Sequence, residues 1–156
     1  KVGGNYAASL KPQMEARKLG FADCIFLDPA THTKIEEVGA ANFFAITKDG
    51  AYITPKSGSI LDSITNRSLK WLAHHKLNMP VHETDIFIEN LDHIQEAGAC
   101  GTAAIITPIS SITYQGIKHV FPCHEKMGKT TEQLYQHLLG IQFGDLPEPV
   151  DWVTIL

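Results

Sequence analysis

The sequence predicts one mixed α/β domain of the α+β kind, in which short strands form a sheet flanked by helices. Short apolar runs bounded by turn residues alternate with longer segments of helical spacing, and neither an internal repeat nor a linker divides the chain. A chain of 156 residues can bury about two thirds of the surface that its unfolded form exposes. Its 44% apolar and 19% charged residues are typical of a folded globular protein.

The first predicted element is a helix over residues 5–18. Apolar side chains recur there at near-helical spacing, and Arg17 and Lys18 precede Gly20, which is typical of a helix end. Pro12 opposes this prediction, because a proline deep inside a helix costs about 3 kcal/mol. We therefore expect either a helix that starts late enough to place Pro12 in its first turns or a kink at this residue.

A meander of short strands joined by hairpins is predicted next, because apolar runs alternate with turn residues. The expected strands cover residues 23–27, 33–38, 42–47 and 51–54. A helix follows, capped by Ser63 or Thr65 and running to about Leu77, with Pro80 ending it.

The second half of the chain is predicted to continue as short alternating elements. We expect a strand over 81–84, a short helix over 90–96, a strand over 105–112 interrupted by Pro108, and a hairpin through Gln115-Gly116 to a strand over 118–121. Thr130, with Gln133 three residues later, predicts a capping-box start for a last helix that ends near Gly140. The tail from Gln142 is predicted to be irregular.

Composition excludes several classes of function. A net charge of −4, with 13 basic residues that form no run, predicts neither a nucleic-acid nor a membrane partner. The 3 cysteines have no CxxC spacing, so we expect no disulfide framework, no metal site and a reducing cytoplasm. No apolar stretch approaches the roughly 18 residues of a membrane span, and the N-terminus lacks a signal peptide's apolar core, which predicts a soluble protein. Because the chain opens at Lys1 rather than Met, we expect a fragment of a longer protein.

Two features carry charged groups that could do chemistry. Lys1 is followed by Gly3-Gly4, which would let the backbone pass close to another group, and a desolvated lysine is a nucleophilic amine. Taken alone it is better explained as a surface charge, as about nine lysines in ten are. Glu36 and Glu37 interrupt an apolar strand pattern and must point to opposite faces, so one of them needs a cationic partner if it is buried. An edge strand with both carboxylates in water is about equally well supported by the pattern.

Two further features offer backbone amides to an anion. Small and hydroxylated residues over 57–65 lead straight into a predicted helix, whose free amides and dipole favour a phosphate. An ordinary N-cap explains the same residues and is the commoner case. Residues 98–104 form a second small-residue turn before a strand, which by itself is only a turn.

In this order, the four features resemble the class IV aminotransferases, and most closely the branched-chain amino acid aminotransferases. The resemblance runs over nearly the whole chain, in the blocks KVGGNYAASL, IEEVGAANFF, TPKSGSILDSITNRSL, EAGACGTAAIITPI and LYQHLLGIQFGD. It implies the C-terminal domain of a fold-type IV pyridoxal-phosphate (PLP) enzyme, with a mixed sheet or pseudo-barrel and flanking helices, over residues 1–156.

The resemblance also implies roles for single residues. Lys1 matches the lysine that binds PLP covalently and then moves the substrate's proton, and Tyr6 matches the tyrosine on the cofactor's ring hydroxyl. Glu37 matches the glutamate that pairs with the pyridinium nitrogen and keeps it protonated.

The phosphate and the substrate carboxylate are matched by the two amide-rich turns. The backbone amides of Ile64 and Thr65, with the Thr65 hydroxyl, should hold the phosphate. Thr102 should also reach the phosphate, and the amides of Thr102 and Ala103 should face the substrate's α-carboxylate. The chain reads Leu61-Asp62-Ser63 where many family members read Leu-Pro-Gly, which loosens the turn and brings a negative charge near the phosphate.

The implied reaction moves the amino group of leucine, isoleucine or valine to 2-oxoglutarate, in branched-chain amino acid metabolism. In the family a separate N-terminal domain supplies a phosphate-binding arginine, the side-chain pocket and part of a homodimer contact. We therefore expect the 156 residues alone to be inactive and the parent protein to be an active homodimer. The animal CxxC is absent, so no thiol switch is expected.

Other functions fit parts of the same pattern. A D-amino acid aminotransferase or an aminodeoxychorismate lyase would share the lysine, the glutamate and the phosphate site. The Glu36-Glu37-Val38-Gly39 block and the closing GIQFGD favour the branched-chain group. A non-catalytic binding domain, with Lys1 on its surface and plain helix caps, is the alternative from a different class.

Overall fold

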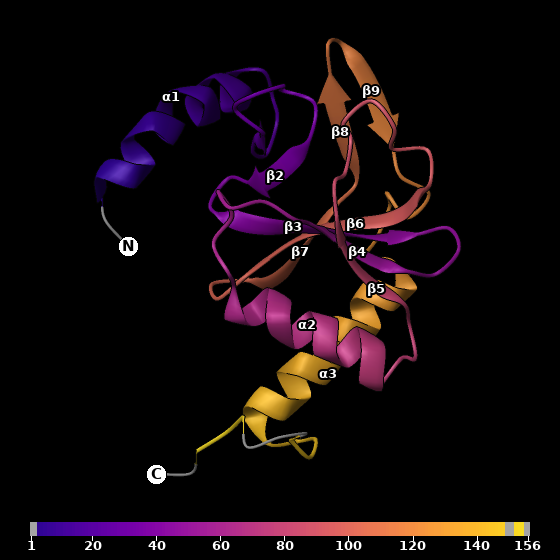
Figure 1. The fold of residues 1–156 in the computed structure, drawn as a ribbon. Coiled ribbons are helices and arrows are strands. Elements are labelled where there is room, and N and C mark those ends of the chain that lie inside the picture. The colour runs from indigo at the N-terminus through magenta and orange to yellow at the C-terminus, as the bar shows by residue number, and fades with distance from the viewer. Residues whose placement is uncertain (1–2, 149–151, 155–156) are drawn as a thin grey trace.

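The computed structural model describes residues 3–148 and 152–154, and the class of the fold is the predicted mixed α+β class (Figure 1). The helices are α1 (Gly3–Lys18), α2 (Ile64–His75) and α3 (Lys129–Phe143). The strands are β1 (Ile25–Leu27), β2 (Ile35–Val38), β3 (Ala41–Thr47), β4 (Tyr52–Pro55), β5 (Val81–Thr84), β6 (Ile94–Gly101), β7 (Ile105–Ile109), β8 (Ser111–Tyr114) and β9 (Ile117–Val120).

Strand β3 is the centre of a mixed seven-stranded sheet. It pairs antiparallel with β6 along one edge, while β2 and then β4 pair with successive parts of the other edge. Strand β1 adds to β2, β7 adds to β6, and β5 lies parallel to β4. The predicted meander and the β8–β9 hairpin are both confirmed, the hairpin as a separate two-stranded sheet.

The side chains of β3 alternate between two cores. Phe43 and Ala45 face a core shared with the 86–94 segment and β8, and Phe44 and Ile46 face a core shared with α2 and α3. Figure 1 shows these two helices together on one side of the sheet and the β8–β9 hairpin on the other. In the described part of the chain, no helix combines the length and the apolar character needed to cross a membrane.

Helix α1 starts earlier than its proline suggests. It begins at Gly3 and continues through Pro12, so a start that places Pro12 in the first turns is wrong. Proline removes the hydrogen bond that its own amide would have made, and its ring crowds the carbonyl four residues earlier, but the helix extends on both sides of Pro12. In Figure 1 the helix lies beside the sheet and apart from α2 and α3.

The short helix expected over residues 90–96 is wrong, because β6 starts at Ile94. Residues 95–97 have good helix propensity, but the strand lies between β3 and β7 and gains hydrogen bonds on both edges. Gly98 pairs with Phe44, whose Cζ atom would lie 2.6 Å from any Cβ at this position. The predicted turn over 98–104 is therefore a strand as far as Gly101 and a turn only from Thr102.

The predicted strand over 105–112 is two strands, and the break is not at Pro108. Pro108 lies inside β7 opposite Gly98, and the chain leaves the sheet at Ser110. Among the described strands, β7 pairs with β6 alone, so the proline nitrogen can occupy the free edge without breaking the ladder.

The capping box predicted at Thr130 is also wrong. The N-cap of α3 is Gly128, which has no side chain that could accept a hydrogen bond. A carboxylate from β6 accepts from the first amides of the helix instead. Glu96 is buried and accepts hydrogen bonds from the amides of Thr130 (3.1 Å) and Thr131 (2.8 Å) and from the Thr131 hydroxyl (2.7 Å). A Cβ at position 128 would overlap Glu96, which explains the glycine. The helix ends at Phe143, beyond the predicted Gly140, where Gly144 takes a left-handed φ of 78°.

The contacts of Glu96 predict its contribution to stability. Replacing Glu96 with Ala leaves one buried amide, one partly buried amide and a buried hydroxyl without an acceptor, and we expect the free energy of unfolding to fall by about 2 to 3 kcal/mol. Urea denaturation measures this loss. Glu132→Ala is the control, because that exposed glutamate in the first turn of α3 contributes about 1 kcal/mol or less. Equal losses for the two variants would contradict the capping role.

Candidate active site

Three strands bring the acidic segment and the second amide-rich turn to one edge of the sheet. Glu37 in β2 lies opposite Asn42 in β3, and Asn42 lies opposite Cys100 in β6. Strand β2 ends, β3 begins and β6 ends at this edge, so the turn over 102–104 follows directly where β6 leaves the sheet. The edge therefore combines a carboxylate with a turn of small residues.

The loop before α2 joins the same edge through the peptide of Leu61. The Leu61 amide donates to Oε1 of Glu37 (3.3 Å), and the Asn42 side-chain amide donates to the Leu61 carbonyl (3.0 Å). Because Leu61 lies only three residues before Ile64, the start of α2 is held close to Glu37. Sequence reasoning missed Asn42, although a single polar residue in the apolar run of β3 is a signal for such a contact.

The N-terminus of α2 has free donors. Ser63 is its N-cap, as one of the two predicted options, and its hydroxyl accepts from the Asn66 amide (3.3 Å). Among the described residues, the amides of Ile64 and Thr65 have no hydrogen-bond partner. Unpaired amides at the positive end of a helix dipole favour an anion.

A buried network fixes the position of this helix end. The Tyr52 hydroxyl donates to Asn66 (2.7 Å), Asn66 donates to the Thr54 hydroxyl (3.0 Å), and Thr54 donates to the carbonyl of Phe43 (2.8 Å). The side chains of Tyr52, Thr54 and Asn66 are all buried, so none of these bonds competes with water. Sequence reasoning missed these residues too, since nothing in their local pattern predicts that they meet.

Glu37 is a half-buried carboxylate with no positive partner among the residues that the structure describes. Burial raises its pKa, the neighbouring charge of Glu36 raises it further, and the hydrogen bond from the Leu61 amide lowers it in part. None of the ion pairs in the described part of the chain involves Glu37. A desolvated carboxylate of this kind is suited to a cationic group supplied by a ligand.

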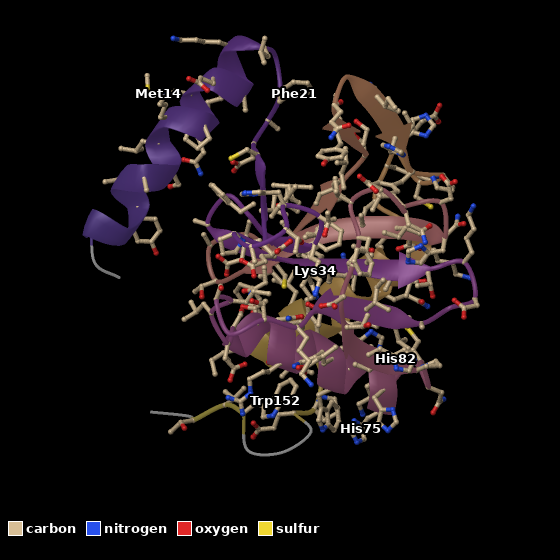
Figure 2. The ribbon with its side chains drawn as sticks, turned by 45° about the horizontal axis from the view of Figure 1, so that its top comes forward. Met14, Phe21, Lys34, His75, His82 and Trp152 are labelled. Atoms are coloured by element: carbon tan, nitrogen blue, oxygen red, sulfur yellow. The ribbon has the colours of Figure 1, made fainter. Side chains whose placement is uncertain are left out.

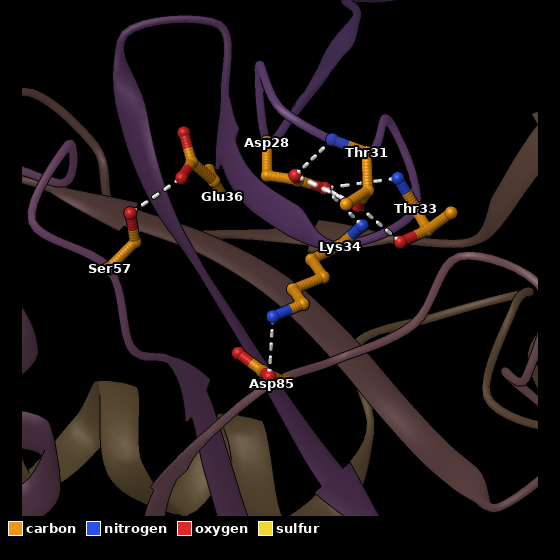
Figure 3. A network of polar contacts seen from close by, with 7 residues as sticks. All are labelled: Asp28, Thr31, Thr33, Lys34, Glu36, Ser57 and Asp85. Carbon is orange, nitrogen blue, oxygen red and sulfur yellow. Dashed lines mark hydrogen bonds and ion pairs between the residues drawn. The ribbon is translucent and has the colours of Figure 1, made fainter.

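Glu36 points away from Glu37, as the alternation of a strand requires. It accepts a hydrogen bond of 2.5 Å from the Ser57 hydroxyl, shown in Figure 3 beside a separate network around Asp28 and Lys34. Both glutamates are half-buried, and β2 pairs with β1 on one side and β3 on the other. The alternative that β2 is an edge strand with two solvent-exposed carboxylates is therefore wrong.

The turn after β6 is exposed and borders a groove. Thr102 and Ala103 are exposed, and among the described residues their amides have no hydrogen-bond partner. A groove of about 970 Å³ runs from this turn past β7 and β8 to the segment after α1. Amides at the mouth of a groove can receive a carboxylate or phosphate from a small molecule.

Two predicted residues are not brought to this edge by any described contact. Lys1 lies outside the described residues. Tyr6 lies on α1 with 37% of its surface exposed, and its hydroxyl has no partner among the described residues. Figure 2 shows Met14 on α1 away from the sheet, and Phe21 where the chain turns back toward it.

Asp62 does not lie free beside the anion site. Its carboxylate is 3.8 Å from Arg67 on α2, and both side chains are largely exposed. An exposed pair at this distance is weak, but it gives the Asp62 charge a positive neighbour near the free amides of α2.

Comparison with known proteins gives a consistent result. A family model described as "Amino-transferase class IV" matches residues 1–112. The branched-chain-amino-acid aminotransferase of Haemophilus influenzae is 56% identical over 99% of this chain and 46% of its own length, and that of Helicobacter pylori is 56% identical over 98% and 44%. The chain thus spans about half the length of these curated relatives.

Solved structures with a similar fold are also named branched-chain amino acid aminotransferases. A branched-chain amino acid aminotransferase from Escherichia coli has a TM-score of 0.80 at 32% identity, covering 96% of this chain and 48% of that one. The branched-chain amino acid aminotransferase from Thermobaculum terrenum in PLP-form has a TM-score of 0.76 at 33% identity, covering 92% and 45%. Another enzyme of this name, complexed with N-(5'-phosphopyridoxyl)-L-glutamate, has a TM-score of 0.84 at 27% identity, covering 99% and 49%.

The raised pKa of Glu37 predicts how stability depends on pH when no ligand is added. Below the pKa of the unfolded chain, Glu37 is protonated in both states and has no cost. As the pH rises through the folded pKa, the native carboxylate must ionise while partly desolvated, and stability is lost. We expect Glu37→Gln to gain stability relative to the parent chain between pH 4 and pH 7, by urea denaturation. If the stability difference between Glu37→Gln and the parent chain is the same at pH 4 and at pH 7, the partly desolvated environment assigned to Glu37 is contradicted.

Proposed function

This chain belongs to the class IV aminotransferases, and we propose that it forms the C-terminal, cofactor-binding domain of a PLP-dependent branched-chain amino acid aminotransferase. The single observation that carries the proposal is the peptide of Leu61, which is hydrogen-bonded to Glu37 and Asn42 three residues before the free amides at the start of α2. The Glu37 carboxylate and these amides suit the ring nitrogen and the phosphate of one PLP molecule. The names of two solved relatives support the cofactor, one in PLP-form and one with a phosphopyridoxyl-glutamate.

The residues of the site fit PLP by their chemistry. Glu37 offers a desolvated carboxylate with no positive partner among the described residues, which would hold a proton on the pyridine nitrogen. The amides of Ile64 and Thr65, with the Thr65 hydroxyl, would bind the phosphate at the positive end of α2. When bound, PLP supplies an electron sink for the charge that develops at the substrate's Cα.

The turn over 102–104 would orient the substrate. Thr102 is proposed to reach the phosphate, while the amides of Thr102 and Ala103 receive the substrate's α-carboxylate at the mouth of the groove. Fixing this carboxylate sets the direction of the Cα–H bond and so decides where the proton must leave.

Lys1 and Tyr6 complete the proposal from their places in the KVGGNY block. The amine of Lys1 is proposed to bind the cofactor at rest, and then to take the proton from Cα and deliver it at the cofactor's carbon as base and acid in turn. The Tyr6 hydroxyl is proposed to hydrogen-bond the cofactor's ring hydroxyl.

The proposed substrates are leucine, isoleucine or valine together with 2-oxoglutarate or glutamate. The names of the relatives support the branched-chain class over a D-amino acid aminotransferase or a lyase. We assign the activity to a full-length protein, because the chain spans about half of its relatives' length, and we propose a homodimer from the family resemblance. Cys24, Cys100 and Cys123 are free thiols, which supports a reducing compartment such as the cytoplasm.

Turnover by the full-length protein tests this proposal directly. We expect transfer from L-leucine to 2-oxoglutarate and little turnover of D-alanine, and Lys1→Arg should lower kcat by about 10²-fold or more. After borohydride reduction with PLP, peptide mapping should find the label on Lys1, whereas Lys18, on exposed helix surface, is the internal control. Turnover of D-alanine above L-leucine, or label spread equally over both lysines, would contradict the assignment.

The isolated chain gives a second test. We expect residues 1–156 alone to transaminate L-leucine at least about 10²-fold more slowly than the full-length protein, because positioning groups come from elsewhere. A coupled assay for released glutamate measures both. Full activity in the isolated chain would contradict the assignment to the longer protein.

A further inference from the structure

The neighbouring glutamates of β2 hold opposite ends of one loop. Glu37 accepts from the amide of Leu61 at one end (3.3 Å), and Glu36 accepts from the hydroxyl of Ser57 at the other (2.5 Å). The family resemblance gives a role to Glu37 alone. Glu36 is left without a function, although its bond to Ser57 is in the range of the short hydrogen bonds made to carboxylates.

Ser57 organises the loop that follows it. Its hydroxyl donates to Glu36 and also accepts from the amide of Ser59 (3.1 Å), and its carbonyl accepts from the amide of Ile60 (3.4 Å). These contacts turn the chain so that it arrives at Leu61, whose peptide lies between Glu37 and Asn42.

The loop has little apolar packing to fix it otherwise. Gly58 and Ser59 are exposed, and Leu61 has 70% of its surface exposed. A Cβ added at Gly58 would meet no atom within 4 Å. The position of the loop therefore depends on the polar contacts at its two ends.

We propose that Glu36 is a positioning residue, which fixes the loop over 57–61 through Ser57 and so holds the Leu61 amide on Glu37 and the free amides of α2 at the cofactor's phosphate. The role rests on the proposed function, because it needs a phosphate-bearing ligand at α2. Glu36 itself touches neither Glu37 nor the amides of α2 in the described hydrogen bonds, and it acts through the hydroxyl of Ser57.

A charge effect of Glu36 is separable from this positioning effect. The negative charge of Glu36 also raises the pKa of Glu37, and any neutral replacement removes that influence. Glu36→Gln removes the charge but keeps an oxygen that can accept from Ser57, whereas Ser57→Ala keeps the charge and removes the hydrogen bond. The two variants therefore isolate the two effects.

PLP binding by the full-length protein tests the proposal. The dissociation constant for PLP would be measured by equilibrium dialysis, with the visible absorbance of the bound cofactor recorded against pH. We expect Glu36→Ala and Ser57→Ala each to weaken binding by about tenfold, and the double variant to be no weaker than either, because both remove one interaction. Glu36→Gln should restore binding to within about twofold of the parent. Ser59→Ala is the matched control, since its exposed hydroxyl has no partner in the described part of the chain.

The outcomes test the role of Glu36 and the proposed function separately. Parent-like binding by Ser57→Ala, or losses that add in the double variant, overturns the role of Glu36 and leaves the proposed function intact. Loss of binding in Glu36→Gln as large as in Glu36→Ala also overturns it, because charge and not position would then matter. If Glu36→Ala fails to fold, Ser57→Ala and Glu36→Gln still test whether the hydrogen bond between Glu36 and Ser57 supports PLP binding. A parent protein that binds no PLP overturns the proposed function itself and the role of Glu36 with it.

Discussion

The peptide of Leu61, held from both sides, is the constraint on which the site depends. Its amide is bound by Glu37 from β2 and its carbonyl by Asn42 from β3, so the sheet and the start of α2 are joined at one point. Without the Leu61 amide, no hydrogen bond in the described part of the chain would join Glu37 to the loop before α2. The buried bonds from Tyr52 through Asn66 hold the rest of the helix end to the same strands. The site is therefore tied by hydrogen bonds to strands and a helix end, and such elements place a small ligand more precisely than loops do.

Much of this fold follows from local sequence patterns. Strands β1 to β4 and helix α2 are predicted to within about two residues at each end, because hydrophobic period and turn residues agree there with the tertiary structure. The pattern fails over 94–101, where helix-forming residues lie in a central strand, and at the start of α3, where the cap comes from Glu96 far away in sequence. In both places a long-range hydrogen bond overrides the local preference, and no local pattern can reveal it.

Some residues of the candidate site are likewise predictable from the sequence and others are not. The acidic pair and the small residues before α2 are visible as chemistry in the sequence, and the helix N-cap at Ser63 follows from its residue type. Asn42, Asn66 and Tyr52 are not visible, because their importance lies in which strands the topology places together. The roles of Lys1 and Tyr6 come from the family resemblance, since Lys1 lies outside the described residues and no described contact links Tyr6 to this part of the sheet.

The central claim is that Glu37 and the first amides of α2 serve one ligand. A crystal structure of the full-length protein grown with PLP measures this most directly. The account predicts the ring nitrogen within about 3 Å of a Glu37 oxygen and the phosphate on the amides of Ile64 and Thr65. Density that places the phosphate away from α2, or the ring nitrogen away from Glu37, would contradict it.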